Sequence, residues 1–483
     1  MKISHVAFGA IVLISASLSA ATAVPSSSSD ATILPFNTKV IMNTTSANPA
    51  VPIVSLDVMG IGLSVEMFRQ SQAWIEIQKH PKGSILPVDL STYPTNFTIK
   101  ELAMDKRSAD VLEWGASRFV EQWPIPSISI WSHCYKPERP DTSFNGKTTY
   151  DFFNDRIQDL RRPAGMHAHR IASLGAIFLN EPEEVLERAF QFFDQNPEVP
   201  ALLLFASDGD MTRLWTGDVS RKPFWEEGPR RIDSMTEAMV VLVLARRDRV
   251  DALRPFTAGA TGDRNAQFHT ERNRQLNAAR AAARAAGKPE PQQLVFKPSR
   301  YVPTPWTEEQ LSQFDRLATI AVVHRPVRVS YRKDKQGKPT FDAAQQTSLM
   351  HDQEQQASFK TGLDAALREI PGGKPARVFY DTGGPVAGRH VVPLSLAAHH
   401  SLPGFDLFKP DQGYDLHARV GNTGAASPFV QWALAAIAAH HHKNASLTVN
   451  LRRNDEATIT AVTPSPDSSN PKKTNPVDFK LAP

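Results

Sequence analysis

The chain has 483 residues, of which 41% are hydrophobic and 22% charged, so it can bury a large core and its length favours ~2 to 3 domains. Its 54 Lys and Arg against 50 Asp and Glu leave a net charge of +4, too small an excess to indicate nucleic-acid binding by itself. The one cysteine, Cys134, excludes an internal disulfide, so the fold does not depend on an oxidising compartment.

The first 23 residues have the layout of a secretory signal peptide. Lys2 precedes an uncharged apolar run, Val6–Ala20, and Ala21-Thr22-Ala23 is a small-residue cleavage pattern. This layout predicts export, and the alternatives are an uncleaved membrane anchor in 1–23 or a misassigned start codon. Residues 24–51 are rich in Ser, Thr, Asn and Pro and are expected to be a flexible lead-in.

Residues 52–256 alternate predicted strands and helices. The first elements along the chain are a strand at Ile53–Met59, a turn at Gly60 and Gly62, a helix within Ser64–Gln78, a helix at Ala109–Gln122 and a strand at Ile125–Trp131. A strand at Leu174–Leu179, a helix opened by Glu181–Glu184 and a strand at Ala201–Ala206 then form a βαβ unit. Such a unit predicts a parallel sheet that is buried on both faces.

Residues 257–305 interrupt this alternation. They are polar and rich in arginine, and Gln275–Ala286 is expected to form an exposed helix. Arg280 and Arg284 lie one turn apart on that helix, where they would suit an acidic partner surface. We favour the simpler interpretation of a solvated linker helix.

Residues 306–463 repeat the alternation in outline, and 464–483 form a Pro-, Ser- and Lys-rich tail that is expected to be disordered. The predicted elements are a helix at Trp306–Leu317, strands at Ile320–Val323 and Val327–Tyr331, a helix at Gln355–Ile370 and a strand at Arg377–Tyr380. The alternation in both stretches predicts an α/β protein with two similar halves.

The most informative stretch is Gly421–Ser427 followed by an Ala-rich run, Pro428–His440, and two predicted strands, Ala445–Leu451 and Ala457–Val462. The run is apolar on nearly every side, which is typical of a buried helix. We therefore predict that Phe429–Ala439 lies between two sheets.

This order resembles the closing segment of the thiolase-like superfamily, which includes the ketoacyl synthases and thiolases. The resemblance extends to Ile53–Gly62, Ala201–Asp208, Glu237–Leu253 and Ala376–Gly384, in the same order along the chain. It implies a layered α/β fold of two similar halves, 52–256 and 306–463, with a buried central helix in each half. The stretch 257–305 is then a linker or an insertion.

The resemblance also implies a cysteine nucleophile where the central helix of the first half begins, and a histidine after the strand at Arg377–Tyr380. This chain has Asn180-Glu181-Pro182-Glu183 at the first place and Asp381-Thr382-Gly383-Gly384 at the second, with no histidine before His390. Asn422 matches an asparagine of one ketoacyl synthase subgroup that helps to form the oxyanion hole. One residue of three is not a catalytic set, because nucleophile and partner act as a unit.

Other candidate sites have simpler interpretations. Cys134 follows His133 directly, and neighbours on a strand point to opposite faces, which favours a partly buried thiol. His167 and His169 lack a third ligand at a helpful spacing, and His440–His442 is expected to close a helix. Gly217–Arg221 lacks the second glycine of a nucleophile elbow, and Gly60-Ile61-Gly62 lacks the third glycine of a dinucleotide fingerprint. We predict no catalytic, cofactor or metal site.

At finer grain the chain resembles the type VI secretion lipase-adaptor family. The residues that carry this resemblance are Leu56–Gln70, Ser207–Leu214, Thr236–Phe256 and Val420–Val462. It implies a non-catalytic cytoplasmic adaptor that holds a phospholipase effector and loads it onto the spike protein of the secretion apparatus, with no nucleic-acid partner.

The signal-like residues 1–23 favour the alternatives, which are an exported acyl-handling thiolase-like enzyme or an exported, immunity-like lipase-binding protein. Both alternatives would place the protein in the periplasm or on the membrane. The pattern specifies neither the binding surfaces nor the oligomeric state.

We predict that the protein carries out no thiolase-type acyl transfer, because the place of the nucleophile holds Asn180-Glu181-Pro182. Incubation with acyl thioesters followed by intact mass spectrometry is expected to show no acylated protein. An adduct on Cys134 that disappears when His133 is replaced would contradict this prediction.

Overall fold

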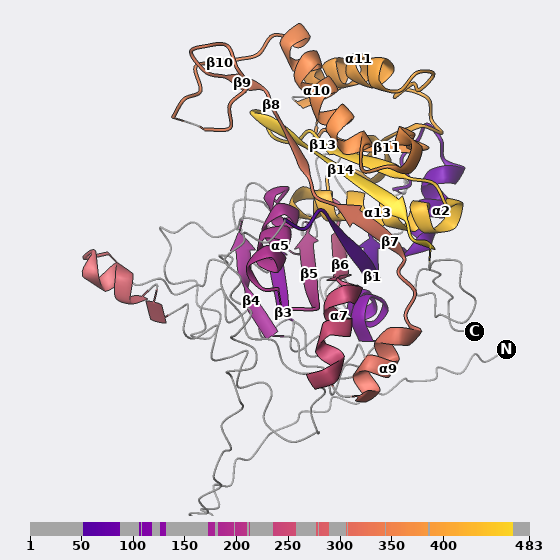
Figure 1. Cartoon of the computed structure of the whole chain (residues 1–483). Coiled ribbons are helices and arrows are strands. Elements are labelled where there is room, and N and C mark those ends of the chain that lie inside the picture. The colour runs from indigo at the N-terminus through magenta and orange to yellow at the C-terminus, as the bar shows by residue number, and fades with distance from the viewer. Residues whose placement is uncertain are drawn as a thin grey trace, which may run out of the picture. The chain divides into compact units, whose positions relative to one another are not determined.

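The computed structural model describes one mixed sheet of 12 strands that runs through two halves built on the same plan (Figure 1). It describes residues 52–86, 106–117 except 108, 126–131, 172–178, 182–209 except 198, 212, 235–256, 277–288 except 279, 306–384 except 307 and 343, and 387–466. The predicted lead-in at 24–51, the signal-like residues 1–23, the tail beyond 466 and most of 257–305 lie outside these residues. The described residues from Pro52 onward belong to one compact unit.

The first half contains five long strands, which are β1 (Ser55–Val65), β3 (Pro126–Trp131), β4 (Ala172–Phe178), β5 (Ala201–Asp208) and β6 (Ala238–Ala245). Their order across the sheet is β1-β6-β5-β3-β4. The strands β5, β3 and β4 run parallel, whereas β6 is antiparallel to both of its neighbours, β1 and β5. The helix α5 (Glu184–Gln195) connects β4 to β5, as the predicted βαβ unit requires.

The second half repeats this order and these directions. Its strands are β7 (Ala321–His324), β11 (Arg377–Asp381), β12 (Gly413–Asp415), β13 (Ser446–Asn450) and β14 (Glu456–Pro464). Their order is β7-β14-β13-β11-β12, with β13, β11 and β12 parallel and β14 antiparallel to β7 and β13. Each strand of the first half therefore has a counterpart in the second. This is the layered α/β fold of two similar halves that the resemblance to thiolase-like proteins implies.

The first strands of the two halves pair with each other. β1 and β7 are antiparallel, with Ser55 opposite His324 and Val58 opposite Ala321. Strand pairing therefore continues from one half into the other, and the two sheets are not separate as the prediction for Phe429–Ala439 assumed. The repeat is retained, because the junction joins equivalent strands.

The helix α13 (Ser427–His442) lies against strands of both halves. It contacts β11, β13 and β14 of the second half and β1 and β6 of the first. Every residue from Ser427 to His440 is buried, and the side chains of Phe429 and Trp432 belong to the core that also contains Leu242 and Val462. The prediction of a buried central helix at Phe429–Ala439 is confirmed, with the physical reason that the run has no polar face to expose.

The helix α5 occupies the corresponding place in the first half and buries one face. Val185, Leu186, Phe190 and Phe193 are in the core. The opposite face is acidic, with Glu187 2.6 Å from a guanidinium nitrogen of Arg325 in the second half. The same guanidinium lies 2.9 Å from Asp194. Burial on one face and ion pairs on the other thus hold α5 between the halves.

The predicted turn at Gly60 and Gly62 is wrong, because β1 continues through both glycines to Val65. The chain turns afterwards, into the short strand β2 (Phe68–Arg69) and the helix α2 (Ser71–Lys79). The glycines admit a close backbone approach by residues 111–117. A Cβ on Gly60 would lie 2.1 Å from the carbonyl oxygen of Gly115, and one on Gly62 would lie 1.9 Å from that of Val111. The Gly60-Ile61-Gly62 pattern, which suggested a turn, is therefore explained by the close approach of the backbone at Val111 and Gly115 to β1.

The helix predicted at Ala109–Gln122 is described as far as residue 117, and its described part includes a π-helical turn, η2 (Glu113–Ser117). Residues 280–285 are helical and mostly exposed, as predicted for the linker helix. Two helices, α10 (Asp352–Leu367) and α11 (Val391–Ser401), pack Phe359 and Leu394 into a second core with Val378 and Leu447.

The remaining elements are α7 (Arg247–Leu253), η3 (Arg254–Phe256), α9 (Glu308–Arg316), β8 (Val327–Ser330), β9 (Arg332–Lys333), β10 (Ser348–Leu349), η4 (Pro371–Gly373), η5 (Ala387–His390), α12 (Leu416–Val420) and η6 (Gly424–Ala426). Within the part of the chain that the structure describes, no helix combines the length and apolarity needed to cross a bilayer.

Replacing Gly60 with Ala is expected to lower the free energy of unfolding by about 1–3 kcal/mol, because the new methyl group must displace the backbone of Gly115. Chemical denaturation of the Gly60→Ala variant measures this loss. Gly83→Ala is the control, since a Cβ there meets no atom within 4 Å. Equal stability of the two variants would show that the close crossing does not form.

Candidate functional site

Five polar residues gather where strands end and the central helices begin, and we call them the polar cluster: Glu183, Asp208, Asp381, Asn422 and Arg452. Asp208 ends β5, Asp381 ends β11, and Arg452 follows β13. Glu183 precedes α5, and Asn422 lies just before η6 and α13. The carboxyl ends of neighbouring strands are where α/β folds place ligands and catalytic groups, so this is the first place to look for chemistry.

Arg452 links the end of β11, at Asp381, to the loop before η6, at Asn422. One guanidinium nitrogen lies 3.3 Å from Asp381 Oδ2 and the other donates to Asn422 Oδ1 at 2.8 Å. Gly383 lies against the guanidinium, because a Cβ at that position would be 2.9 Å from Arg452 Cζ. Asp381 is 1% exposed at its side chain, so the pair is an internal one. Removing one member of such a pair leaves a buried charge without compensation.

Two further donors bond the carboxylate of Asp381, and a third bonds one of those donors. The Ser427 hydroxyl donates to Asp381 Oδ2, and the backbone N–H of Gly383 donates to Oδ1 at 2.7 Å. Asn450 Nδ2 donates in turn to Ser427 Oγ at 3.2 Å. The hydroxyl at the start of α13 is therefore bonded to a carboxylate that an arginine already holds, which is not the arrangement that activates a serine nucleophile.

Asp208 holds the other end of the Gly421–Ser427 segment. Its Oδ2 accepts a hydrogen bond from the backbone N–H of Ala425 at 2.7 Å, and its Oδ1 accepts one from that of Gly209 at 2.8 Å. Gly424 has φ +53, and a Cβ there would lie 1.9 Å from Asp208 Oδ2. The glycine in this motif is thus required by a carboxylate more than 200 residues earlier, in addition to its backbone conformation.

Asn422 lies within the cluster, in the position that the resemblance implies, but its side-chain oxygen is already used. Asn422 Oδ1 accepts from Gly424 N at 3.1 Å as well as from Arg452. Its backbone carbonyl accepts from Thr236 N at 2.9 Å, which fixes the loop to the first half. These bonds give Asn422 a structural role in shaping the loop.

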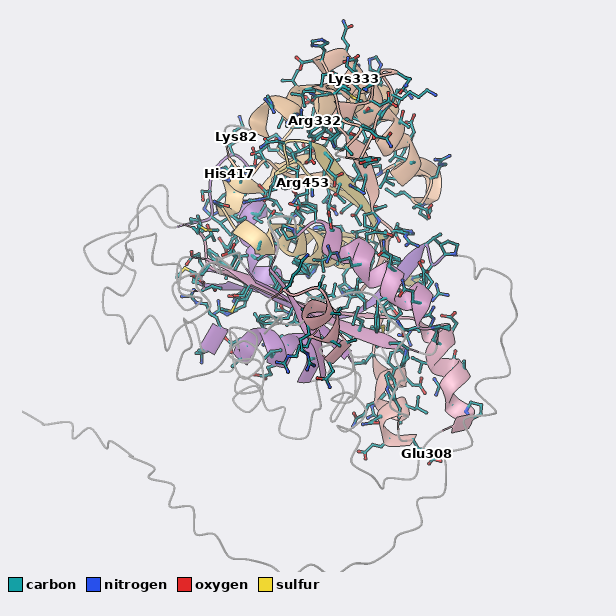
Figure 2. All side chains as sticks on the ribbon, turned by 90° about the vertical axis from the view of Figure 1, so that its left-hand side faces the viewer. Lys82, Glu308, Arg332, Lys333, His417 and Arg453 are labelled. Carbon is teal, nitrogen blue, oxygen red and sulfur yellow. The ribbon has the colours of Figure 1, made fainter. Side chains whose placement is uncertain are left out.

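Glu183 directly precedes α5, within the stretch where the resemblance to thiolase-like proteins implies a nucleophile. It is 3% exposed, and its Oε2 atom has no hydrogen-bond partner. Burial raises the pKa of Glu183 to about 7, although Arg452 and Arg453 act in the opposite direction. Arg453, labelled in Figure 2, lies 3.5 Å from Glu184 and 2.8 Å from Asp455. The desolvation cost therefore outweighs the attraction of two nearby cations.

The other residues singled out from the sequence are elsewhere or undescribed. His390 ends η5 and is buried; its ring stacks on Tyr331 with centroids 4.1 Å apart, and its Nδ1 lies 2.9 Å from Oε1 of Gln355 on α10. Burial lowers the pKa of His390 to about 4, so the ring is neutral. His440 is buried near the end of α13, and His442 accepts a hydrogen bond from Trp74 Nε1 at 3.1 Å.

Several candidates lie outside the described residues, namely Asn180, Glu181, His133, Cys134, His167, His169 and the segment 217–221. Where side chains are described, no three of His, Cys, Asp or Glu converge in a way that could hold a metal ion.

Two family models together match most of residues 54–464. The model described as "Type VI lipase adapter protein Tla3, N-terminal" matches residues 54–226, and "Type VI lipase adapter protein Tla3, C-terminal" matches residues 320–464. The chain belongs to the type VI lipase adapter protein Tla3 family. The two Tla3 matches include every member of the polar cluster, and residues 227–319 fall between them.

Solved structures similar to this Tla3-family chain include ketosynthases. One is the ketosynthase from module 1 of the bacillaene synthase from Bacillus amyloliquefaciens, with 10% identity and a TM-score of 0.41 over 86% of this chain and 76% of that chain. Another is the ishigamide ketosynthase/chain length factor, with 10% identity and a TM-score of 0.40 over 85% and 99% of the two chains. Such low values transfer no activity to this chain.

The sequence analysis missed Arg452, Asp208 and the burial of Glu183. Asp208 and Asp381 are the last residues of apolar strands, and Arg452 comes two residues after another. A charged residue at the end of an apolar strand is the sequence feature that could have identified them. No pattern in the neighbouring sequence indicated that Glu183 is buried, because the residues near it, such as Asp381 and Arg452, are distant in sequence.

Replacing Glu183 with Gln is expected to stabilise the protein increasingly as pH rises. A carboxyl group whose folded-state pKa of about 7 exceeds its ordinary value of 4.5 contributes stability below pH 4.5, and that contribution is lost as pH rises through 7. Relative to the wild type, Glu183→Gln should therefore gain about 2 kcal/mol between about pH 5 and about pH 8.

Urea denaturation at several pH values measures this difference, with Glu308→Gln as an exposed control (Figure 2). A stability gap that does not change with pH would show that Glu183 is hydrated and ionised normally.

Proposed function

We propose that this Tla3-family protein is a non-catalytic adaptor. It binds a phospholipase effector in the cytoplasm and loads that effector onto the spike protein of a type VI secretion apparatus. The family description supports the adaptor role for a type VI lipase. The phospholipase activity of the partner, the loading step and the cytoplasmic location are parts of this proposal.

The observation that carries the proposal is the content of the polar cluster. Condensation on this type of scaffold needs a thiolate at the start of the first central helix and an imidazole after β11. Glu183 stands at the first place, and Asp381 paired with Arg452 stands at the second. A buried carboxyl group and an internal ion pair hold loops together but form no acyl thioester.

The same contacts support a scaffolding role. The polar cluster joins loops from both halves, since Asp208 belongs to the first half and Ala425, which donates to it, belongs to the second. Arg325 adds ion pairs from the second half to Glu187 and Asp194 on α5. A rigid frame of this kind can present surface segments to a partner without a loss of conformational entropy on binding.

We expect the full-length chain to copurify with a type VI lipase effector of the same organism, in a complex stable to gel filtration. An interface of standard size, ~1,600 Å² in total, would give that stability at micromolar concentration. The experiment is coexpression and gel filtration at low salt, with and without residues 1–23, followed by addition of the spike protein. A chain that binds neither protein in either form would remove the support for the adaptor role.

A further inference from the structure

The hairpin between β1 and β2 exposes an apolar side chain between two unusual backbone positions. Among the residues that the structure describes, three other than glycine have positive φ, and two of them, Glu66 at 50° and Gln70 at 49°, flank this hairpin. Side chains other than glycine rarely adopt such values unless the surroundings enforce them, and the strain concentrates at functional segments. Met67, which lies between them, is 61% exposed.

Buried hydrogen bonds enforce the strained positions on both sides. Glu66 N donates to the carbonyl of Glu237 at 2.9 Å, and Glu237 N donates to Glu66 Oε1 at 3.0 Å. The amide of Gln70 bonds the backbone of Leu63 and Ile61 at 2.5 Å each. The hairpin is therefore fixed to the sheet, and Met67 is held outward by the fold.

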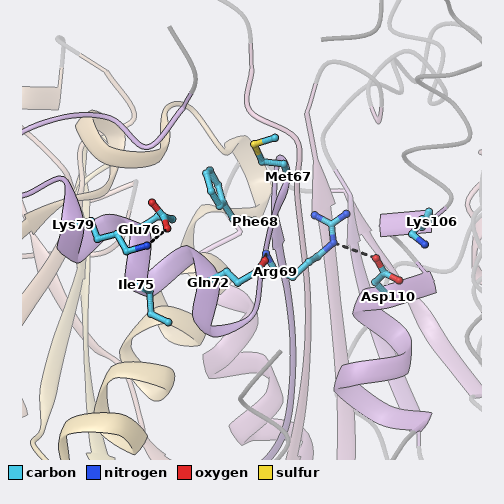
Figure 3. Close-up of a pocket in the computed structure, with 9 residues that line it drawn as sticks. All are labelled: Met67, Phe68, Arg69, Gln72, Ile75, Glu76, Lys79, Lys106 and Asp110. Carbon is cyan, nitrogen blue, oxygen red and sulfur yellow. Dashed lines mark hydrogen bonds and ion pairs between the residues drawn. The ribbon is translucent and has the colours of Figure 1, made fainter. Parts of the chain in front are cut away.

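The adjacent helix α2 completes a surface hollow with this hairpin (Figure 3). Trp74 and Ile77 bury one face of α2, with the Trp74 ring 5.5 Å from that of Phe379 in the second half. The opposite face presents Ile75, which is 41% exposed. The hollow has a volume of about 540 Å³ and is lined by Met67, Phe68, Arg69, Gln72, Ile75, Glu76, Lys79, Lys106 and Asp110.

Among the described residues that line this hollow, positive side chains outnumber negative ones. Asp110 is paired with Arg69 at 3.3 Å, and Glu76 is paired with Lys79 at 2.7 Å. No described carboxylate pairs with Lys106, which lines the same hollow. The electrostatic complement is therefore an anionic group next to an apolar one.

We propose that the hollow between the hairpin and α2 is the docking surface for the lipase effector. The segment that binds is a stretch of the effector with an apolar side chain flanked by carboxylates. The apolar side chain contacts Met67, Phe68 and Ile75, and a carboxylate lies at Lys106. An unbranched methionine adapts to the shape of a partner, and a preformed hairpin binds without ordering first. This inference rests on the proposed adaptor function and adds the surface that performs it.

Biolayer interferometry tests the proposal. It measures the affinity of the full-length chain for the purified lipase effector of the same organism. Met67→Asp and Ile75→Asp are each expected to raise Kd about tenfold or more, because they place a carboxylate in the apolar contact. Val392→Asp and Leu396→Asp are the matched controls, since these side chains are 55% and 48% exposed on α11. All four positions are at the surface, and circular dichroism with thermal unfolding confirms that the variants are folded.

The charge at Lys106 is tested separately. Lys106→Glu is expected to slow association and to weaken its dependence on salt, with a smaller effect on dissociation. A photocrosslinking residue placed at Met67 should couple to an apolar, acid-flanked segment of the lipase, which peptide mass spectrometry identifies. The same residue placed at Val392 should not.

The outcomes separate the two proposals. If the wild-type chain binds the lipase but Met67→Asp and Ile75→Asp change Kd by less than about twofold, the docking surface is wrong and the adaptor function stands. If the wild-type chain does not bind the lipase, both proposals fail. If Met67→Asp converts a self-associated form to a monomer and leaves lipase affinity unchanged, the hollow is occupied by a second copy of the chain, and the docking surface is again wrong.

Discussion

Burial of α13 on all sides is the constraint on which the rest of the structure depends. A helix whose residues from Ser427 to His440 are all buried must be covered around its whole circumference. One strand layer on one side covers only one face of a helix, so strands of both halves and the helix α2 supply the cover. The repeated strand order meets this need, because each half contributes strands that contact α13. It also explains why β5 and β6 are buried along their whole length, without the alternation of a strand that faces solvent on one side.

The start of α13 shows how a buried junction tolerates charge. Asp208, Asp381 and Arg452 lie where four loops meet, and each has partners that satisfy its hydrogen bonds. Burying such groups costs solvation, and replacing a buried ion pair with apolar residues is often neutral or stabilising. We interpret the cluster as a device that fixes the register of the loops between the halves, because the backbone N–H of Ala425 in the second half donates to the carboxylate of Asp208 in the first.

In this scaffold the buried polar contacts and the exposed apolar side chains lie in different places. The interior holds its loops with the protein's own side chains, whereas Met67 and Ile75 are exposed on elements anchored by Gln70 and Trp74. Folds host many functions because the surface changes while the frame is retained. The polar cluster joins loops of the two halves, and Met67 and Ile75 are apolar side chains left at the surface.

The sequence by itself determined the periodic features. The apolar runs at Ala201–Ala206 and Pro428–His440 predicted a strand and a buried helix, because a continuous apolar pattern leaves no polar face. It also determined that no cysteine stands at the start of α5, since the one cysteine of the chain is Cys134. Only the tertiary structure decided what Gly60 and Gly62 do, since the reason is the backbone of Val111 and Gly115, about fifty residues away along the chain. The polar cluster was likewise decided by contacts between segments more than 200 residues apart, such as Asp208 with Ala425. Periodicity reports which face of an element is buried, but not what it is buried against, so the burial of Glu183 and the exposure of Met67 follow from the assembled halves alone.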